Sequence, residues 1–152
     1  THNDTKFNNI LFDKSEHAMC IVDLDTVMPG SILFDFGDAI RTGANTATED
    51  EKDLSKVDIN LPIYQAYTQG FVKSTRHTLT EIEIENLAFS ARFMTFIIGL
   101  RFLTDYIDGD PYFRTLYAEH NLDRARVQFR LVEQMETKAG KMEKIVLQAL
   151  DN

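Results

Sequence analysis

The chain has 152 residues, of which 43% are hydrophobic and 26% are charged, as is typical of a globular protein with one sizeable core. Sixteen basic against 24 acidic residues give a net charge of -8 at pH 7. This acidic excess argues against nonspecific binding to nucleic acid or to an anionic membrane. The single cysteine, Cys20, cannot form an internal disulfide, and we expect it to be a small core residue. With no visible signal peptide and no apolar run long enough to span a bilayer, a cytoplasmic protein is expected.

The N-terminal third of the chain is predicted to form loops, two short strands and a helix. Strands are predicted over Asn9–Phe12 and Ala18–Leu24, the second around β-branched residues. A Pro-Gly pair at 29–30 indicates a turn, and a helix is expected over Ile32–Arg41. The polar, turn-rich stretch 43–56 is expected to be a surface loop or lid.

From residue 61 onward the spacing of apolar residues favours helices. A capping box at Thr80–Glu83 predicts the start of a helix that continues to about Tyr106 and is largely buried. Asp110-Pro111 is typical of another helix start, and a last helix is expected over Leu122–Leu150. The fold class is therefore predicted as α+β and mainly helical. In the helix that is expected to begin at about residue 61, three aromatic residues lie on one stripe: Tyr64, Tyr67 and Phe71.

Residues 2–9, with the sequence HNDTKFNN, have the form H-x-D-x-K-x-x-N, which is the spacing of a kinase catalytic loop. Phosphoryl transfer needs a positioned hydroxyl, metal ions on the phosphates and stabilisation of charge. Asp4 can accept the hydroxyl proton, Lys6 can reach the transferring phosphoryl group, and Asn9 can hold Mg²⁺. His2 is expected to pack the loop beneath the site rather than to act as an acid or a base.

A second metal ligand is expected at Asp23. In the kinase pattern an Asp follows the metal-binding Asn after a short hairpin, and Asp23 lies 14 positions beyond Asn9, at the end of a predicted strand. Asp35 belongs to an Asp-Phe-Gly triplet but lies 26 positions beyond Asn9, too far for a simple hairpin. We therefore interpret the match between this triplet and the metal-binding Asp-Phe-Gly of kinases as coincidental. Asp25 is either a helper at the metal or a solvated carboxylate.

The loop at 2–9, followed by VDLDTVMPG at 22–30 and DFGD at 35–38, resembles the aminoglycoside phosphotransferase and choline kinase superfamily. Within it, the sequence is most similar to N-acetylhexosamine 1-kinases, which are sometimes labelled mucin desulfatases. Members have a protein-kinase-like fold with a small nucleotide-binding lobe before a larger, mostly helical lobe. The resemblance implies that residues 1–152 form the C-terminal lobe, with a short β-hairpin near its N-terminus.

The resemblance also implies a role for each residue of the motifs. Asp4 would be the catalytic base, Lys6 a catalytic residue near the phosphates of ATP, and Asn9 and Asp23 the Mg²⁺ ligands. Asp35 would brace the catalytic loop by accepting hydrogen bonds from it. ATP and Mg²⁺ are thus the expected cofactors, and the expected acceptor is a sugar, most specifically the C1 hydroxyl of an N-acetylhexosamine.

The nucleotide-binding lobe is expected to be absent from this chain and to be its partner, so the isolated chain is expected to be inactive or nearly so. Two alternatives stay open: a kinase for another small acceptor, such as choline or an aminoglycoside, and a non-catalytic kinase-like binding module. Asp38 and Arg41, one helical turn apart, are expected either to form a salt bridge or to contact the sugar.

Overall fold

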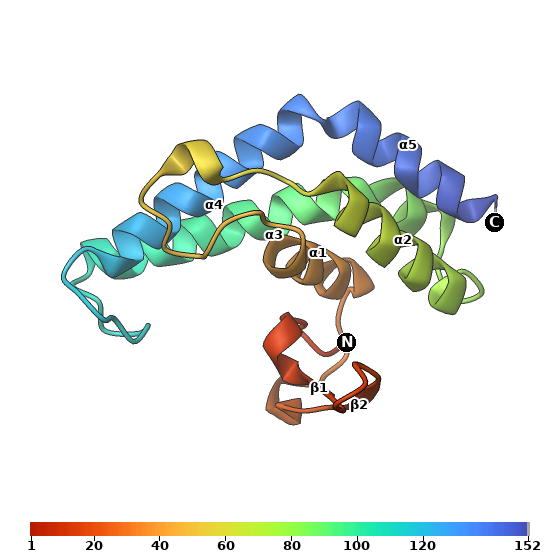
Figure 1. The fold of residues 1–152 in the computed structure, drawn as a ribbon, viewed down its shortest axis with the longest axis horizontal. Coiled ribbons are helices and arrows are strands. Elements are labelled where there is room, and N and C mark those ends of the chain that lie inside the picture. Colours follow the sequence, from red (N-terminus) through yellow and green to blue (C-terminus); the bar gives the residue numbers. More distant parts are fainter. Residues whose placement is uncertain (152) are drawn as a thin grey trace.

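The structure is a computed structural model that describes residues 1–151. The described residues form five α-helices and one two-stranded antiparallel sheet near the N-terminus, which confirms the mainly helical prediction (Figure 1). Single 3-10 turns lie at Phe7–Asn9, Leu24–Thr26 and Leu54–Lys56. The strands and helices are β1 (Ile10–Phe12), β2 (Ala18–Ile21), α1 (Ile32–Gly43), α2 (Leu61–Thr75), α3 (Glu81–Ile107), α4 (His120–Thr137) and α5 (Ala139–Leu150).

The β1–β2 hairpin belongs to a small head, residues 1–31, that projects from the helical body below α1 (Figure 1). The register pairs Ile10 with Ile21 and Leu11 with Cys20. Both strands were expected, but the expectation that Cys20 is a core residue is wrong, because its side chain is exposed. All four residues of β2 are exposed, since no second layer of the described structure covers this hairpin.

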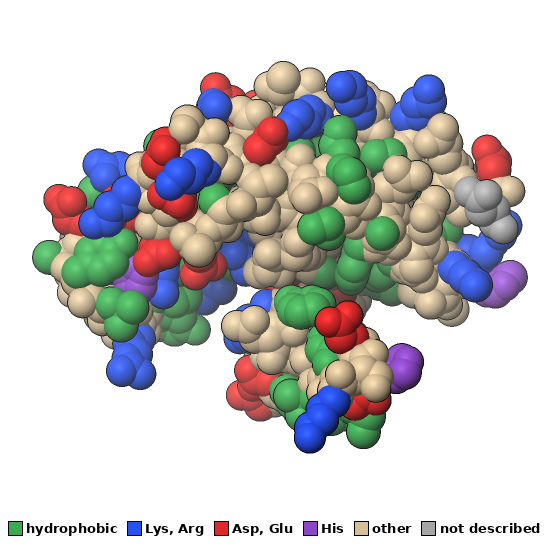
Figure 2. Space-filling view, viewed as in Figure 1, with side chains coloured by type: hydrophobic (Ala, Val, Ile, Leu, Met, Phe, Trp, Pro, Cys, Tyr) green, Lys and Arg blue, Asp and Glu red, His purple; other side chains and the backbone are tan. Residues whose placement is uncertain are grey.

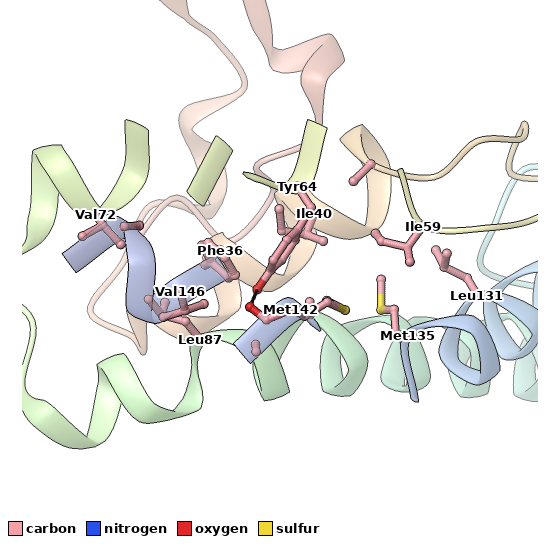
Figure 3. Packing of buried hydrophobic residues seen from close by; sticks show 14 of the residues in the cluster. Phe36, Ile40, Ile59, Tyr64, Val72, Leu87, Leu131, Met135, Met142 and Val146 are labelled. Atoms are coloured by element: carbon pink, nitrogen blue, oxygen red, sulfur yellow. Dashed lines mark hydrogen bonds between the residues drawn. The ribbon is translucent and has the colours of Figure 1, made fainter. Parts of the chain in front are cut away.

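The helical body is arranged around α3, which packs against α1 and α4, while α2 packs against α5. Figure 3 shows the core where these helices meet. Tyr64 from α2 is fully buried there, and its hydroxyl donates to the Met142 carbonyl oxygen at 3.4 Å. Phe36 from α1 packs edge-on against Tyr64 and Phe71, which extends the core toward the head. The predicted aromatic stripe is therefore the side of α2 that receives α1.

The capping box at the start of α3 is confirmed: Thr80 and Glu83 exchange side-chain and backbone hydrogen bonds. The expectation that α3 is largely buried is wrong in part, because Leu87 is buried while Phe93 and Leu100 are 40% and 41% exposed. By length and composition alone α3 could cross a membrane, and 39% of its most apolar stretch is buried within the protein. Core helices of proteins outside membranes meet the same two criteria, and α3 packs along two neighbours.

Two expected helix boundaries differ from the structure. No helix begins at Asp110, because the buried Asp105 carboxylate accepts the backbone N–H groups of Tyr112 and Phe113, both at 2.9 Å, and holds a turn there. The last helix is divided at Lys138, whose side chain pairs with Asp58. The division lets α4 follow α3 while α5 turns onto α2 (Figure 1).

Candidate active site

The segment 1–5 is held against the N-terminal part of α1 by Asp35. Its two carboxylate oxygens accept the backbone N–H groups of His2 and Asn3, both at 2.8 Å. The backbone carbonyl of Asp35 accepts a third bond, from the Thr5 hydroxyl at 2.6 Å. Ser31 caps α1 by accepting the N–H of Leu33, which sets the position from which Asp35 reaches the loop. Three bonds to one residue therefore determine where the backbone around Asp4 lies.

Asp4 lies at the centre of the candidate site. Its Oδ2 accepts a hydrogen bond from Lys6 Nζ at 2.7 Å and another from Asn9 Nδ2 at 3.0 Å. Partial burial acts to raise the pKa of Asp4, but the bonds from Lys6 and Asn9 and the charge of Lys6 outweigh it, so the pKa lies below its usual value. The hydrogen bond to Asp4 in turn raises the pKa of Lys6. At neutral pH the site thus holds a carboxylate beside an ammonium group.

Asn9 and Asp23 are brought to the same place by the hairpin. Val22 N–H donates to the Asn9 carbonyl at 2.9 Å, so Asp23 follows directly after the residue paired with Asn9. Lys6 Nζ lies 3.8 Å from Asp23 Oδ2 and links this carboxylate to Asp4. Asn9 is buried and turns its Nδ2 toward Asp4, at the backbone carbonyl and at Oδ2. The opposite atom of that amide, Oδ1, is an oxygen of the kind that Mg²⁺ prefers.

Asp23 has φ 64° and ψ 55°, in the left-handed region that Asp adopts more readily than most residues. No group of three or more His, Cys, Asp or Glu side chains suited to a metal occurs within residues 1–151. A metal here would accordingly have two protein ligands, Asn9 and Asp23, with its other positions open to phosphate oxygens and water.

His2 joins the loop to the end of the hairpin. Its Nε2 lies 3.1 Å from the Val22 carbonyl oxygen, which can only accept, so Nε2 carries the proton. Its backbone N–H is the one bound by Asp35, and its carbonyl accepts the Thr26 hydroxyl at 2.6 Å. His2 is therefore in contact with the residue next to Asp23 as well as with α1.

Residues 1–60 match the model of the phosphotransferase enzyme family, APH. The match covers the head, α1 and the segment that leads to α2, and so includes all six residues named as site candidates from the sequence. We call residues 1–60 the family-matched segment. Kinases of the APH family generally use ATP, and the match leaves the acceptor undetermined.

A pocket of about 720 Å³ opens between the family-matched segment and α2. We call it the catalytic pocket. Asp4, Lys6 and Asn9 line it from the loop, and Tyr67 and Phe71 line it from α2. Sequence reasoning placed these two aromatic residues on a helix stripe but gave them no part in a site. The signal was present in their spacing, but only the packing of α2 beside the loop shows what they face.

Sequence reasoning also missed two polar residues that hold the loop. Asn3 has φ 63° and donates from Nδ2 to the Thr26 carbonyl at 3.0 Å. Thr26 donates its hydroxyl to His2, so the 3-10 turn after Asp23 is bonded directly to the loop that carries Asp4. Both residues lie inside motifs that the sequence marked, at positions where a short polar side chain carries no distinctive pattern.

Each residue of the Asp-Phe-Gly triplet at 35–37 makes a structural contact of its own. Asp35 binds the loop, and Phe36 is fully buried in the core. Gly37 faces α3, where an added Cβ would lie 2.5 Å from the Ser90 carbonyl oxygen. The three residues thus connect the loop, the aromatic core and the α1–α3 contact.

The geometry answers one open question about charged residues, that of Asp38 and Arg41, and the role of Asp25 stays a prediction. Arg41 donates to Asp38 Oδ1 from Nε at 2.9 Å and from Nη2 at 2.8 Å, and both side chains are buried. The salt-bridge interpretation of this pair is confirmed. Asp25 is exposed in the turn after Asp23, as a solvated carboxylate would be.

Replacing Asp35 with asparagine is expected to loosen the loop. Asparagine offers one oxygen and one NH₂ group, so one of the backbone N–H groups of His2 and Asn3 would face a donor. We expect a loss of about 1–3 kcal/mol in the free energy of unfolding, measured by urea denaturation. Asp25→Asn, on an exposed side chain, is the matched control and is expected to change stability by less than about 0.5 kcal/mol. Equal stability of the two variants would show that the Asp35 bonds do not hold the loop.

Proposed function

We propose that this chain is the C-terminal lobe of a protein-kinase-like phosphotransferase that uses ATP and Mg²⁺ to phosphorylate a small molecule. The acceptor we propose is a sugar, most specifically the C1 hydroxyl of an N-acetylhexosamine. The observation that supports this most directly is the Asp4 carboxylate held by Lys6 and Asn9, with Asp23 beside Lys6, inside a segment that matches the phosphotransferase family.

In this proposal Asp4 orients the acceptor hydroxyl and takes its proton as the oxygen attacks the γ-phosphorus. The bond between the γ-phosphorus and the bridging oxygen of ATP breaks in the same step, and ADP leaves with that oxygen. The lowered pKa keeps Asp4 ionised, so that it can accept a hydrogen bond from the hydroxyl throughout the neutral range. Lys6 keeps its charge near the transferring group. Most of the rate enhancement would come from holding these groups in place, which is what the bonds from Asp35 and Asn9 provide.

Asn9 and Asp23 would hold the metal. The donor set fits, since an amide oxygen and a carboxylate are hard oxygen ligands and Mg²⁺ is commonly bound by one or two protein groups together with phosphates. Mg²⁺, when bound, would neutralise the negative charge that develops on the phosphates of ATP. Lys6 Nζ lies 2.7 Å from Asp4 Oδ2 and 3.8 Å from Asp23 Oδ2, so its charge offsets the repulsion between these two carboxylates.

A second lobe is proposed as the partner of the head. Large apolar side chains are exposed around the hairpin and the turns beside it, within the head that projects from the helical body (Figure 1). An exposed apolar area of this kind is typical of a surface that another domain or a ligand covers. We propose that the nucleotide base and the nucleotide-binding lobe cover it, in a protein of the cytoplasm. The exposed residues are Phe7, Leu11, Met19, Ile21, Leu24, Val27 and Met28.

The test uses the complete protein that carries residues 1–152, incubated with Mg-ATP and one acceptor at a time. The acceptors are N-acetylglucosamine, N-acetylgalactosamine, galactose, choline and an aminoglycoside, and new phosphate esters are followed by phosphorus NMR. A sugar 1-phosphate is the expected product. An ester of choline or of the aminoglycoside would support the kinase function and show that the proposed acceptor is wrong. No ester, together with no binding of Mg-ATP by calorimetry, would favour the non-catalytic binding module.

Lys6→Met is expected to move the acid side of the pH–rate profile to higher pH. The hydrogen bond and charge of Lys6 lower the pKa of Asp4, so removing them raises that pKa. Because the ionised carboxylate is the base, the rate falls as pH drops through this pKa, and the fall then begins at higher pH. We also expect kcat to fall by about 10²-fold, as for the loss of one stabilising donor. The measurement is kcat/KM for the acceptor from about pH 3 to about pH 8, because the pKa of Asp4 lies below that of a free Asp. If the acid limb has the same position in Lys6→Met as in the wild type, Lys6 does not control the ionisation of Asp4.

A further inference from the structure

A second pocket, of about 460 Å³, lies beside the catalytic pocket on the side away from α2. We call it the polar pocket. Its lining comes from Lys6, Phe7 and Asn8 of the loop, from residues between Arg41 and Glu49, and from Gln128 of α4. Lys6, Phe7, Asn8 and Thr42 line both pockets, so a ligand in the polar pocket would lie next to Asp4. Figure 2 shows the hollow between the projecting head and the helical body.

Gln128 is the most deeply buried side chain of this lining. It is 1% exposed, and its Oε1 accepts no hydrogen bond from the described residues. The Cβ of Gln128 packs against Gly99 of α3. A Cβ added at Gly99 would lie 3.0 Å from the Cβ of Gln128. Buried amide oxygens normally have a donor, so an unpartnered one at the wall of a pocket indicates a place for a ligand donor.

The charges around the polar pocket are paired within the protein. Arg41 is bound by Asp38 and also donates from Nη1 to Glu49 at 3.1 Å, while Lys6 is bound by Asp4. Glu49 also lies 3.4 Å from Arg124 Nε. A ligand therefore meets amides, hydroxyls and neutralised ion pairs rather than an uncompensated charge. Such a lining suits a neutral ligand with O–H or N–H donors better than a quaternary amine or a polycation.

We propose that the polar pocket receives the acceptor and that Gln128 positions it by accepting a hydrogen bond from an O–H or N–H group of a neutral, polyhydroxylated molecule. This inference rests on the proposed function for the role of Asp4. It adds to that function a residue far along the chain, outside the segment that matches the family. It also favours a neutral sugar over choline and over aminoglycosides.

The first test compares Gln128→Leu with Gln134→Leu, a matched change on the same helix that is outside the pocket lining. With the complete protein, Mg-ATP and N-acetylglucosamine, Gln128→Leu is expected to raise the acceptor KM about 5–10-fold, the cost of one lost hydrogen bond. The KM for ATP should stay within about twofold, and Gln134→Leu should leave both unchanged. If Gln128 had a purely structural role, Gln128→Leu would lower the melting temperature, and the KM for the acceptor would not rise more than the KM for ATP. An unchanged acceptor KM in Gln128→Leu would overturn the inference.

The second test needs no variant in the pocket and no phosphoryl transfer. The side-chain amide signals of Gln128 and Gln134 are followed by ¹H–¹⁵N NMR of the wild-type protein as N-acetylglucosamine, galactose or choline is added. The Gln128 signals are expected to shift with the two sugars and not with choline, while those of Gln134 stay in place. If no acceptor is phosphorylated but Gln128 shifts, the proposed function fails and the sugar site stands. If phosphorylation occurs and Gln128 does not respond, the kinase stands and this inference is overturned.

Discussion

Asp4→Asn is expected to reduce the rate of phosphoryl transfer by about 10³-fold, within the range found when a general base is removed. The amide keeps the size of the carboxylate but cannot take the proton of the acceptor hydroxyl. It also removes the negative charge that pairs with Lys6, while its one oxygen can still accept the bonds that Lys6 and Asn9 donate to Oδ2 in the wild type. The measurement is kcat with saturating Mg-ATP and sugar, made on the complete protein.

The control for Asp4→Asn is Asp13→Asn, in the exposed turn of the hairpin. Asp13 accepts the N–H groups of Ser15 and His17 through one oxygen, Oδ1, which asparagine also has. We therefore expect this variant to keep the wild-type rate. Mg-ATP affinity, measured by calorimetry, should change little in Asp4→Asn because Asn9 and Asp23, the metal ligands that we propose, remain. An Asp4→Asn enzyme with a tenth or more of the wild-type rate would rule out Asp4 as the base.

Gly37→Ala is expected to lower the free energy of unfolding by about 2 kcal/mol, because it forces apart two helices that are in backbone contact. The new Cβ would lie 2.5 Å from the Ser90 carbonyl oxygen and 2.6 Å from Met94 Cγ. The Met94 side chain can rotate away, but a carbonyl in the middle of α3 can move only with its helix. For a chain of this length the change corresponds to a fall of about 4–8 °C in melting temperature, measured by calorimetry or circular dichroism.

The matched control for Gly37→Ala is Gly70→Ala, in the interior of α2. An added Cβ at Gly70 meets no atom within 4 Å. Alanine has the higher helix propensity, so this variant is expected to be more stable than wild type by about 0.5–1 kcal/mol. The two substitutions thus have opposite signs, and the same sign for both would show that close packing of α1 on α3 is not what requires glycine at 37.

The motifs of the head could be found from the sequence because their chemistry is local. The H-x-D-x-K-x-x-N loop brings Asp4, Lys6 and Asn9 together over six positions, and the hairpin returns Asp23 to the same place. The capping box of α3 is local in the same sense, since its partners lie three residues apart. Such features depend on the conformation of a few consecutive residues, and residue type and spacing are enough to indicate them.

Burial and helix breaks were decided by tertiary structure. Cys20 and Phe93 are residue types that are typical of a core. Both are exposed, because no described element covers the hairpin or that side of α3. The break at Lys138 leaves no strong signal in the sequence and follows from the need of α4 and α5 to pack on different helices.

The polar pocket depends on tertiary structure most of all. Gln128 is about 120 positions from the catalytic loop, and nothing in its sequence surroundings distinguishes it from other polar residues of a helix. The sequence by itself therefore determined which residues form the catalytic loop, the hairpin and the helix caps, because these features rest on neighbouring residues. Which side chains face a pocket, and which apolar ones stay exposed, was decided by the packing of α1, α3 and α4, because burial depends on elements that are distant along the chain.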